Sequence, residues 1–192
     1  MSTPEGLERE KRLTRIRRLS NVMKWFVTAL LILVSIVGAL LVLLLLLPTL
    51  LDVSTGMLDL AGKERRLGDI PFAQRLGLVA MVLFAFFLLR RILWNIRQLF
   101  AQFEDGAFFA PATQAHVLNA GFWLLAYGVF DILSDPISSV LLTWDNAPGK
   151  RSLEIALNGG EFFFLVFGAL LLVFGWIMRE AAALANENRQ FV

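Results

Sequence analysis

The chain of 192 residues contains no cysteine and only one histidine, His116. Without cysteine it cannot form disulfides, thiolate metal sites or iron–sulfur clusters, and it cannot use thiol catalysis. A lone histidine excludes bis-histidine haem ligation and ordinary zinc chemistry. The sequence patterns of serine hydrolases, zinc proteases and phosphate-binding loops are missing as well. We therefore expect no enzymatic activity, no cofactor and no metal, and we expect His116 to be a hydrogen-bonding residue at the membrane interface.

Charge is also scarce. Asp, Glu, Lys and Arg make up 18% of the chain, whereas 57% is apolar and the mean hydropathy is +0.67. This composition excludes an ordinary water-soluble domain. The apolar residues fall into four runs, about residues 25–47, 72–94, 117–133 and 162–178, to be compared with the ~20 residues that cross ~30 Å of hydrocarbon. We predict an all-α, polytopic membrane protein, one domain over residues 1–192, with four transmembrane helices in an antiparallel bundle.

The distribution of lysine and arginine predicts the orientation of these helices. The first run is too long for a signal peptide and lacks a cleavage site of small residues, so it should remain as a transmembrane helix. Residues 1–24, 90–116 and 179–192 together carry twelve of the eighteen basic residues. Because cytoplasmic segments are enriched in lysine and arginine, both termini should lie in the cytoplasm, with 179–192 as a cytoplasmic tail.

The cytoplasmic segment 1–24 is basic and has an apolar residue at each helical turn near its end. These apolar residues are Leu13, Ile16, Leu19 and Met23. We expect an amphipathic helix that anchors the chain on the bilayer through anionic headgroups. The alternative is a docking surface for an acidic partner or nucleic acid. For the docking surface, an acidic protein partner is expected and direct contact with nucleic acid is not.

On the opposite side, the connections between helices are long enough to hold structure of their own. Segment 48–71 is longer than most helix connections, so we expect the first helix to continue past the membrane or an interfacial helix to follow. Asp135 before Pro136 fits the start of a short helix that ends at Trp144. Ser152 fits the start of the fourth helix ahead of the bilayer. We therefore predict helical extensions on the outer side of the membrane.

Glycines recur at regular spacing in the last two runs. Gly121 and Gly128 are seven residues apart, as are Gly168 and Gly175, and Gly160 lies eight residues before Gly168. Small residues on one face let helices approach closely in lipid, where packing holds helices together. We predict that the third and fourth spans pair closely and antiparallel. A hinge at these glycines is the alternative.

Four carboxylates gather near the outer ends of the third and fourth spans: Asp131, Asp135, Glu154 and Glu161. A carboxylate within a span suggests function, and Asp131 lies ~21 Å along the third span, in its outer part. One interpretation is a cation or proton site that faces outward. The other is structural, with Asp131 paired to Arg75 or hydrogen-bonded to Tyr127, and Asp135 acting only as a helix cap.

Two arginines occur within the second run. Arg90 and Arg91 lie about one turn before Trp94. We expect their side chains to extend to the inner headgroups. Pairing with an anionic lipid or with the acids of a partner is the alternative.

The segment 100–116 interrupts the apolar sequence with a turn. An apolar stripe continues the second span up to it: Ile92, Ile96, Leu99, Phe100 and Phe103. Gly106 is expected to end this helix and Pro111 to open the next. Phe108 and Phe109, between them, are apolar anchors that direct the chain back to the membrane.

This segment, LFAQFEDGAFFAPATQAHVLNAGF, resembles the central element of the bacterial family called domain of unknown function 2975. The ending REAAALANENRQFV is similar to the end of members of that family, including a final Phe-Val, here Phe191 and Val192. The resemblance runs from about Trp25 onward. Ala110 departs from it, because a helix-capping serine is more usual there.

The resemblance implies a small multi-pass protein of the bacterial inner (plasma) membrane without an assigned activity. It also implies a partner by analogy, because many proteins that look like members of this family are encoded beside a small helix-turn-helix transcription regulator. Phe108, Phe109 and Phe191 are the candidate contacts on the cytoplasmic face. The alternative is a small transporter, channel or cation-binding subunit, compatible with a homo-oligomer, that uses the outward carboxylates.

Overall fold

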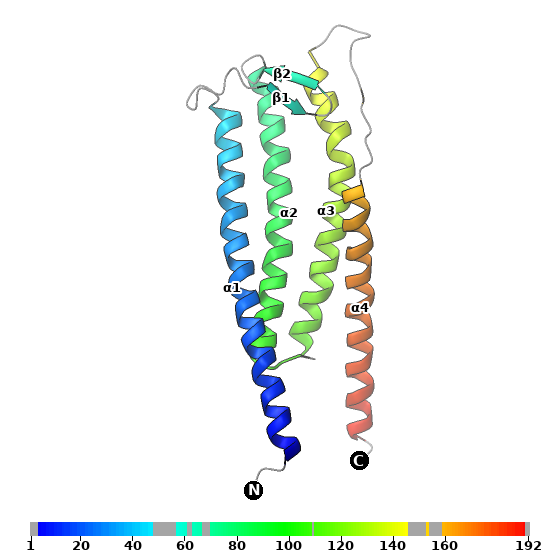
Figure 1. Cartoon of the computed structure of the whole chain (residues 1–192). Helices are drawn as coiled ribbons and strands as arrows, with labels where there is room; N and C mark the ends of the chain where they lie inside the picture. Colours follow the sequence, from blue (N-terminus) through cyan, green and yellow to red (C-terminus); the bar gives the residue numbers. More distant parts are fainter. Residues whose placement is uncertain are drawn as a thin grey trace.

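The computed structural model describes residues 4–47, 57–60, 63–66, 70–108, 110–145, 153 and 159–190. Four long helices lie side by side (Figure 1). They are α1 (Pro4–Leu46), α2 (Phe72–Glu104), α3 (Pro111–Thr143) and α4 (Gly159–Gln190). All four are long and apolar enough to cross a membrane, which confirms the predicted class of a helical, multi-pass membrane protein.

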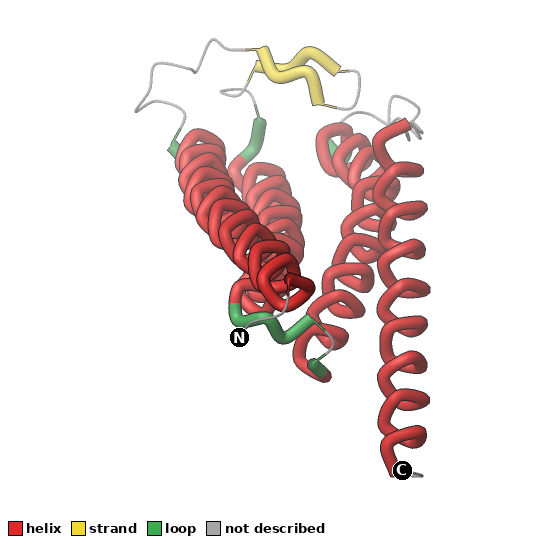
Figure 2. Tube along the Cα trace, turned by 60° about the horizontal axis from the view of Figure 1, so that its bottom comes forward, coloured by secondary structure: helices red, strands yellow, loops and turns green. Residues whose placement is uncertain are grey.

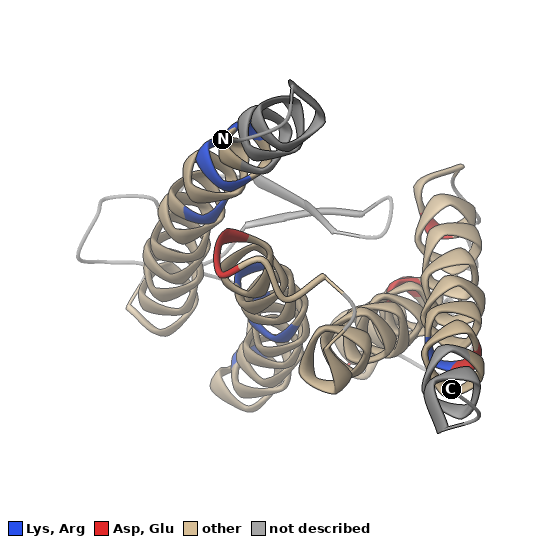
Figure 3. Cartoon of the chain, turned by 90° about the horizontal axis from the view of Figure 1, so that it is seen from below, with Lys and Arg blue, Asp and Glu red and all other residues tan. Residues whose placement is uncertain are grey.

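Helices that follow one another in the chain pack against one another. Extensive helix–helix contacts within the described residues join α1 to α2, α2 to α3 and α3 to α4. Seen from the end that carries both termini, α1 and α4 stand at opposite ends of a bent row (Figure 3). The bundle is therefore open between its first and last helices.

Between α1 and α2 the structure places two strands, β1 (Met57–Leu60) and β2 (Lys63–Arg66). They pair antiparallel, with Met57 opposite Arg66 and Leu60 opposite Lys63. Figure 2 shows this hairpin across the end of the bundle where α1 ends and α2 begins. The prediction of a helix within 48–71 is therefore wrong for residues 57–60 and 63–66, which form strands. The sequence offers the physical reason, because a glycine lies between the two strands and suits a tight hairpin connection, whereas it disfavours a helix.

The end of α3 nearer the hairpin corrects a second prediction. Instead of a new helix at Pro136 with Asp135 as its cap, α3 continues through the proline to Thr143. Proline lacks a backbone donor, so Pro136 leaves the carbonyl of Ile132, four residues earlier, without its helical hydrogen bond, while neighbouring carbonyls gain serine hydroxyl donors. Three serine hydroxyls donate to carbonyl oxygens three residues earlier: Ser134 to Asp131 at 2.8 Å, Ser138 to Asp135 at 3.1 Å, and Ser139 to Pro136 at 2.9 Å. The helical extension predicted here is thus part of α3.

The backbones of α3 and α4 approach each other closely at paired glycines. A Cβ added at Gly121 would lie 2.9 Å from the carbonyl oxygen of Gly168 and 2.9 Å from the amide nitrogen of Leu172. A Cβ at Gly168 would lie 2.9 Å from the amide nitrogen of Leu125. Only glycine lets the two backbones meet at this distance.

The other glycines differ in their surroundings. Gly128 faces Leu165 and Gly175 faces Leu118, so residue numbers rise along α3 as they fall along α4. Gly160 does not join this contact, because a Cβ there would meet nothing within 4 Å.

A small apolar core lies at the hairpin end. Its buried members come from α1, α2, α3 and the segment before α2: Leu45, Ile70, Leu78, Val79 and Leu142. Most large apolar side chains along the helices are instead exposed, including Trp25 and Trp176, which are 65% and 70% exposed. Such an apolar exterior suits contact with lipid.

Candidate functional site

The turn between α2 and α3 is built as predicted. Gly106 has a φ of +78°, a conformation that favours glycine, and α2 ends two residues before it. Pro111 is the first residue of α3. Ala110, at the N-cap, makes no side-chain cap, but the Thr113 hydroxyl donates to the carbonyl oxygen of Ala107 at 2.6 Å. Thr113 is fully buried, and its hydroxyl fastens the first turn of α3 to the turn segment.

Phe108 packs within the protein. Its ring centroid lies 5.6 Å from that of Phe103, whose ring in turn meets Phe100 at 6.4 Å. Phe108 remains half-buried, so part of its ring is accessible. The other two candidate contacts, Phe109 and Phe191, lie outside the described residues.

The basic segment of α1 is held against this turn. Lys24 forms an ion pair with Glu104 at the end of α2, and the Arg97 Nε donates to the Thr28 hydroxyl at 3.1 Å. The Arg17 side chain covers Gly106, where an added Cβ would lie 3.2 Å from Nη2. Blue residues of α1 accordingly lie beside the red tip of α2 in Figure 3. The basic segment therefore continues the α1 helix and is braced by α2.

His116 joins two helices, as its expected role as a hydrogen-bonding residue requires. Its Nδ1 lies 3.3 Å from Oδ1 of Asn95 on α2, and the Asn95 Nδ2 donates to the Arg91 carbonyl oxygen at 2.8 Å. Asn95 is buried. The pair ties the start of α3 to α2.

Three of the four predicted carboxylates lie in the half of the bundle nearer the hairpin. Asp131 and Asp135 lie one turn apart on α3, and Asp131 is within electrostatic range of Glu161 in the first turn of α4. Glu161 is buried, at 4% exposed. Glu154 lies outside the described residues.

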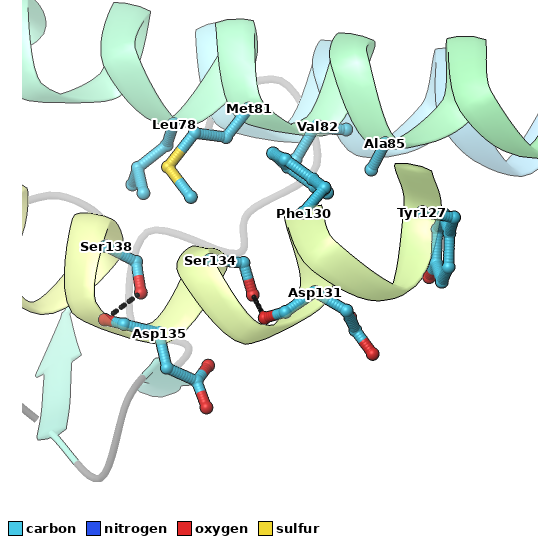
Figure 4. Close-up of a pocket in the computed structure, with 10 residues that line it drawn as sticks. All are labelled: Leu78, Met81, Val82, Ala85, Tyr127, Phe130, Asp131, Ser134, Asp135 and Ser138. Carbon is cyan, nitrogen blue, oxygen red and sulfur yellow. Dashed lines mark hydrogen bonds between the residues drawn. The ribbon is translucent and has the colours of Figure 1, made fainter. Parts of the chain in front are cut away.

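Asp131 and Asp135 line a cavity of about 330 Å³ between α2 and α3 (Figure 4). Its α2 wall is apolar, with Leu78, Met81 and Val82, and in Figure 4 both carboxylates point away from that wall. Within the described part of the chain, no three histidine or acidic side chains are placed to hold a metal ion.

The structural partners predicted for Asp131 are engaged elsewhere. The Arg75 Nε donates to the carbonyl oxygen of Ile70 at 2.8 Å. The Tyr127 ring packs edge-on against Phe164, with centroids 4.9 Å apart, although its phenol stays within electrostatic range of Asp131. The charged groups that act on Asp131 are thus carboxylates, those of Glu161 and Asp135.

The hydrogen bond between Gln74 and Asp145 could not be predicted from the sequence. The Gln74 Nε2 donates to Asp145 Oδ1 at 2.9 Å and links the start of α2 to the residues just after α3. Gln74 is buried, and its Oε1 has no hydrogen-bond partner within the described residues. Because the two residues are 71 apart in the chain, their contact depends on the packing of the two helices.

Comparisons with protein-family models, with curated proteins and with solved structures gave no match. The family resemblance of the turn segment therefore stays a prediction.

Proposed function

We propose that this chain is a non-enzymatic protein of a bacterial plasma membrane that docks a small helix-turn-helix transcription regulator on its cytoplasmic face. The proposal includes an antiparallel arrangement of the four spans with both termini inside. One observation carries it: α1 and α4 both project beyond the turn between α2 and α3, at the same end of the bundle (Figure 1). Two projecting helices beside a turn form a surface that a soluble protein can contact.

The part of α1 that lies level with the turn, just before the projecting part, has the chemistry of a docking surface. Ile16, Leu19 and Val22 are 41%, 58% and 56% exposed and recur every three residues, so they lie along one side of the helix. Arg15 and Arg18 beside them are exposed as well. An apolar stripe flanked by positive charge suits an acidic protein surface, and the charges would accelerate its encounter.

The docking surface is already ordered before a partner binds, which favours binding. The ion pair of Lys24 with Glu104 and the packing of Arg17 at Gly106 hold the segment in one orientation. A surface that is already ordered loses less conformational entropy when a partner binds. On the other projecting helix, Arg179 and Glu180 are exposed.

Co-purification from native membranes tests this proposal. A small DNA-binding regulator should be retained by the wild-type protein and lost from the double variant Ile16→Asn with Leu19→Asn, because the variant removes the apolar stripe without touching the ion pair. Leu153→Asn is the matched control, since Leu153 is 64% exposed and lies far along the chain from this surface. Retention of the regulator by the double variant, or its absence from wild-type preparations, would reject the proposal.

A second candidate is a small transporter, channel or cation-binding subunit, alone or as a homo-oligomer. The cavity of about 330 Å³ next to Asp131 and Asp135 favours it, together with the buried Glu161 nearby. Carboxylates in a span are costly unless they pair or serve a pathway for ions or protons. This candidate predicts that a cation or proton acts through Asp131.

A further inference from the structure

Contacts between α1 and α2 show which of their residues lie at the same depth. A Cβ added at Gly38 would lie 2.8 Å from the ring of Phe86, and four residues further along α2 Arg90 lines the same groove as Ser35. Closer to the termini, Lys24 forms its ion pair with the last residue of α2. Residue numbers therefore fall along α2 as they rise along α1, and Arg90 is level with Ser35.

Ser35 lies near the middle of the apolar stretch of α1. This stretch runs without a charge from Trp25 to Leu47, about 33 Å at ~1.5 Å per residue, close to the ~30 Å of a hydrocarbon core. Ser35 is about 15 Å from its start and about 18 Å from its end. Arg90 and the adjacent Arg91 are thus near the middle of the bilayer, where a charge is costly unless it is paired.

This depth does not fit the expected contact of the two arginines with headgroups. The headgroups lie about 15 Å away on either side, further than an arginine side chain extends. The Arg91 guanidinium instead lies 5.1 Å from the ring centroid of Trp123 and 5.8 Å from that of Phe87. Arg90 and Arg91 are both exposed, and among the described residues no carboxylate pairs with either.

The two arginines belong to an exposed stripe of α2. Its members recur every three or four residues, so they lie along one side of the helix, as in a helix that packs against another. The stripe consists of Leu83, Phe84, Phe87, Arg90, Arg91 and Trp94. The last four residues but one of these, Phe87 to Arg91, line a cavity of about 300 Å³ together with Trp94. The exposed side of α2 is therefore apolar, with two positive charges and a hollow at the depth of the midplane.

We propose that a transmembrane helix of another membrane protein covers this stripe and pairs a carboxylate at its own midpoint with Arg90 and Arg91. Charge complementarity carries the proposal, because two exposed cations at the midplane need an anion at the same depth, and lipid phosphates lie at the surfaces. Guanidinium groups bind carboxylates through charge and paired hydrogen bonds. Stacking on Trp123 already orients the Arg91 guanidinium, which reduces the entropy lost on binding.

The described carboxylates of a second copy lie at the wrong depth. Asp131 lines its cavity with Val82 of α2, about 12 Å along that helix from Arg90, and Glu161 is within electrostatic range of Asp131. Glu104 is about 21 Å away in the other direction. An upright or inverted copy would therefore bring none of these carboxylates to the midplane.

A synthetic transmembrane peptide is the probe that tests this site. It is a leucine-rich helix of ~20 residues with one glutamate at its centre, lysines at both ends and an acceptor dye. Energy transfer from a donor dye on Ala183→Cys, in phosphatidylcholine vesicles, measures its binding. The protein should bind this peptide about tenfold more tightly than a peptide with glutamine at the centre. The double variant Arg90→Gln with Arg91→Gln should lose that preference.

Two controls separate a defined site from general attraction between charges. Moving the glutamate about eight residues from the centre of the peptide shifts it by ~12 Å, and this peptide should bind no better than the glutamine peptide. Because the protein is unchanged in this control, it also covers the case that the arginine variant does not fold. Arg15→Gln with Arg18→Gln removes the same charge from the exposed part of α1 and should leave the preference for central glutamate intact.

Equal binding of the central glutamate and glutamine peptides would overturn the proposal. Full binding of the peptide with the shifted glutamate would do the same, as would an equal loss in the Arg15 and Arg18 variant. Dimers of the wild-type protein that disappear in the Arg90 and Arg91 variant would show that a second copy covers the stripe, and would reject a helix of another protein.

Discussion

Individual polar side chains fix how neighbouring helices meet in this protein. Lys24 reaches Glu104 between α1 and α2, and Asn95 meets His116 between α2 and α3. Between apolar helices in lipid there is little hydrophobic driving force, so a few polar contacts can set the alignment of two helices. The sequence pointed to His116 as a hydrogen-bonding residue, but its partner, Asn95, lies 21 residues away and depends on how α2 and α3 align.

The acidic surroundings of Asp131 lead to a prediction about stability. We expect Asp131→Asn to raise the melting temperature in detergent at neutral pH, because Asp135 is one turn away and like charges at that spacing cost ~0.2–0.5 kcal/mol. Proximity to Glu161 adds to the effect. Glu180→Gln, on an exposed carboxylate near the other end of the bundle, should leave the melting temperature unchanged.

The same variant tests the second candidate function. If Asp131 holds a cation, the salt of that cation should raise the melting temperature of the wild-type protein and have no effect on Asp131→Asn, since a ligand stabilises only the state that binds it. A wild-type protein that does not respond to Na⁺, K⁺, Mg²⁺ or Ca²⁺ would remove the support for a cation site. A lower melting temperature of the variant would mean that Asp131 has a stabilising partner.

Between α3 and α4, glycine spacing decides how closely two elements approach. We expect Gly121→Ala to destabilise the protein by about 1–3 kcal/mol, because the added methyl group meets backbone atoms that cannot move independently. A gain in helix propensity of ~1 kcal/mol offsets part of this loss. Thermal unfolding in detergent measures the difference.

Gly160→Ala provides the matched control for this prediction. Its added methyl group meets open space, so the same change should be neutral or stabilising by up to ~1 kcal/mol. Equal stability of the Gly121 and Gly160 variants would contradict the close contact between α3 and α4.

The ends of the elements show where reading the sequence succeeds. Gly106 and Pro111 are identifiable from the sequence because each residue has a conformational preference of its own. Pro136 is misleading for a related reason: local preference favours a helix start at proline, but α3 runs through it and packs against α2 and α4 along its length. The hairpin of β1 and β2 escapes prediction because its pairing gives only a weak local pattern.

For the whole molecule, the proposed topology leads to a labelling experiment. The chain has no cysteine, so single cysteines can be introduced without removing native ones. A membrane-impermeant maleimide applied to intact cells should label Leu153→Cys but not Arg15→Cys or Ala183→Cys, all at exposed positions. Inverted membrane vesicles should give the opposite pattern.

Labelling of Arg15→Cys and Ala183→Cys from opposite sides would rule out an even number of crossings. Labelling of both from outside intact cells would reverse the orientation expected from the distribution of basic residues. The docking proposal would fail with it, since a transcription regulator is reached from the cytoplasm.

Composition and local preference determined that this protein is helical, that it has four segments suited to a membrane, and where its central turn lies. Transfer of apolar residues into lipid and the dihedral preferences of glycine and proline are local properties, so the sequence alone reveals them. Tertiary structure decided which residues meet across helices: Gly121 with Gly168, Asn95 with His116, and Arg91 with Trp123. These meetings depend on the rotation and register of whole helices, which result from packing along their entire length.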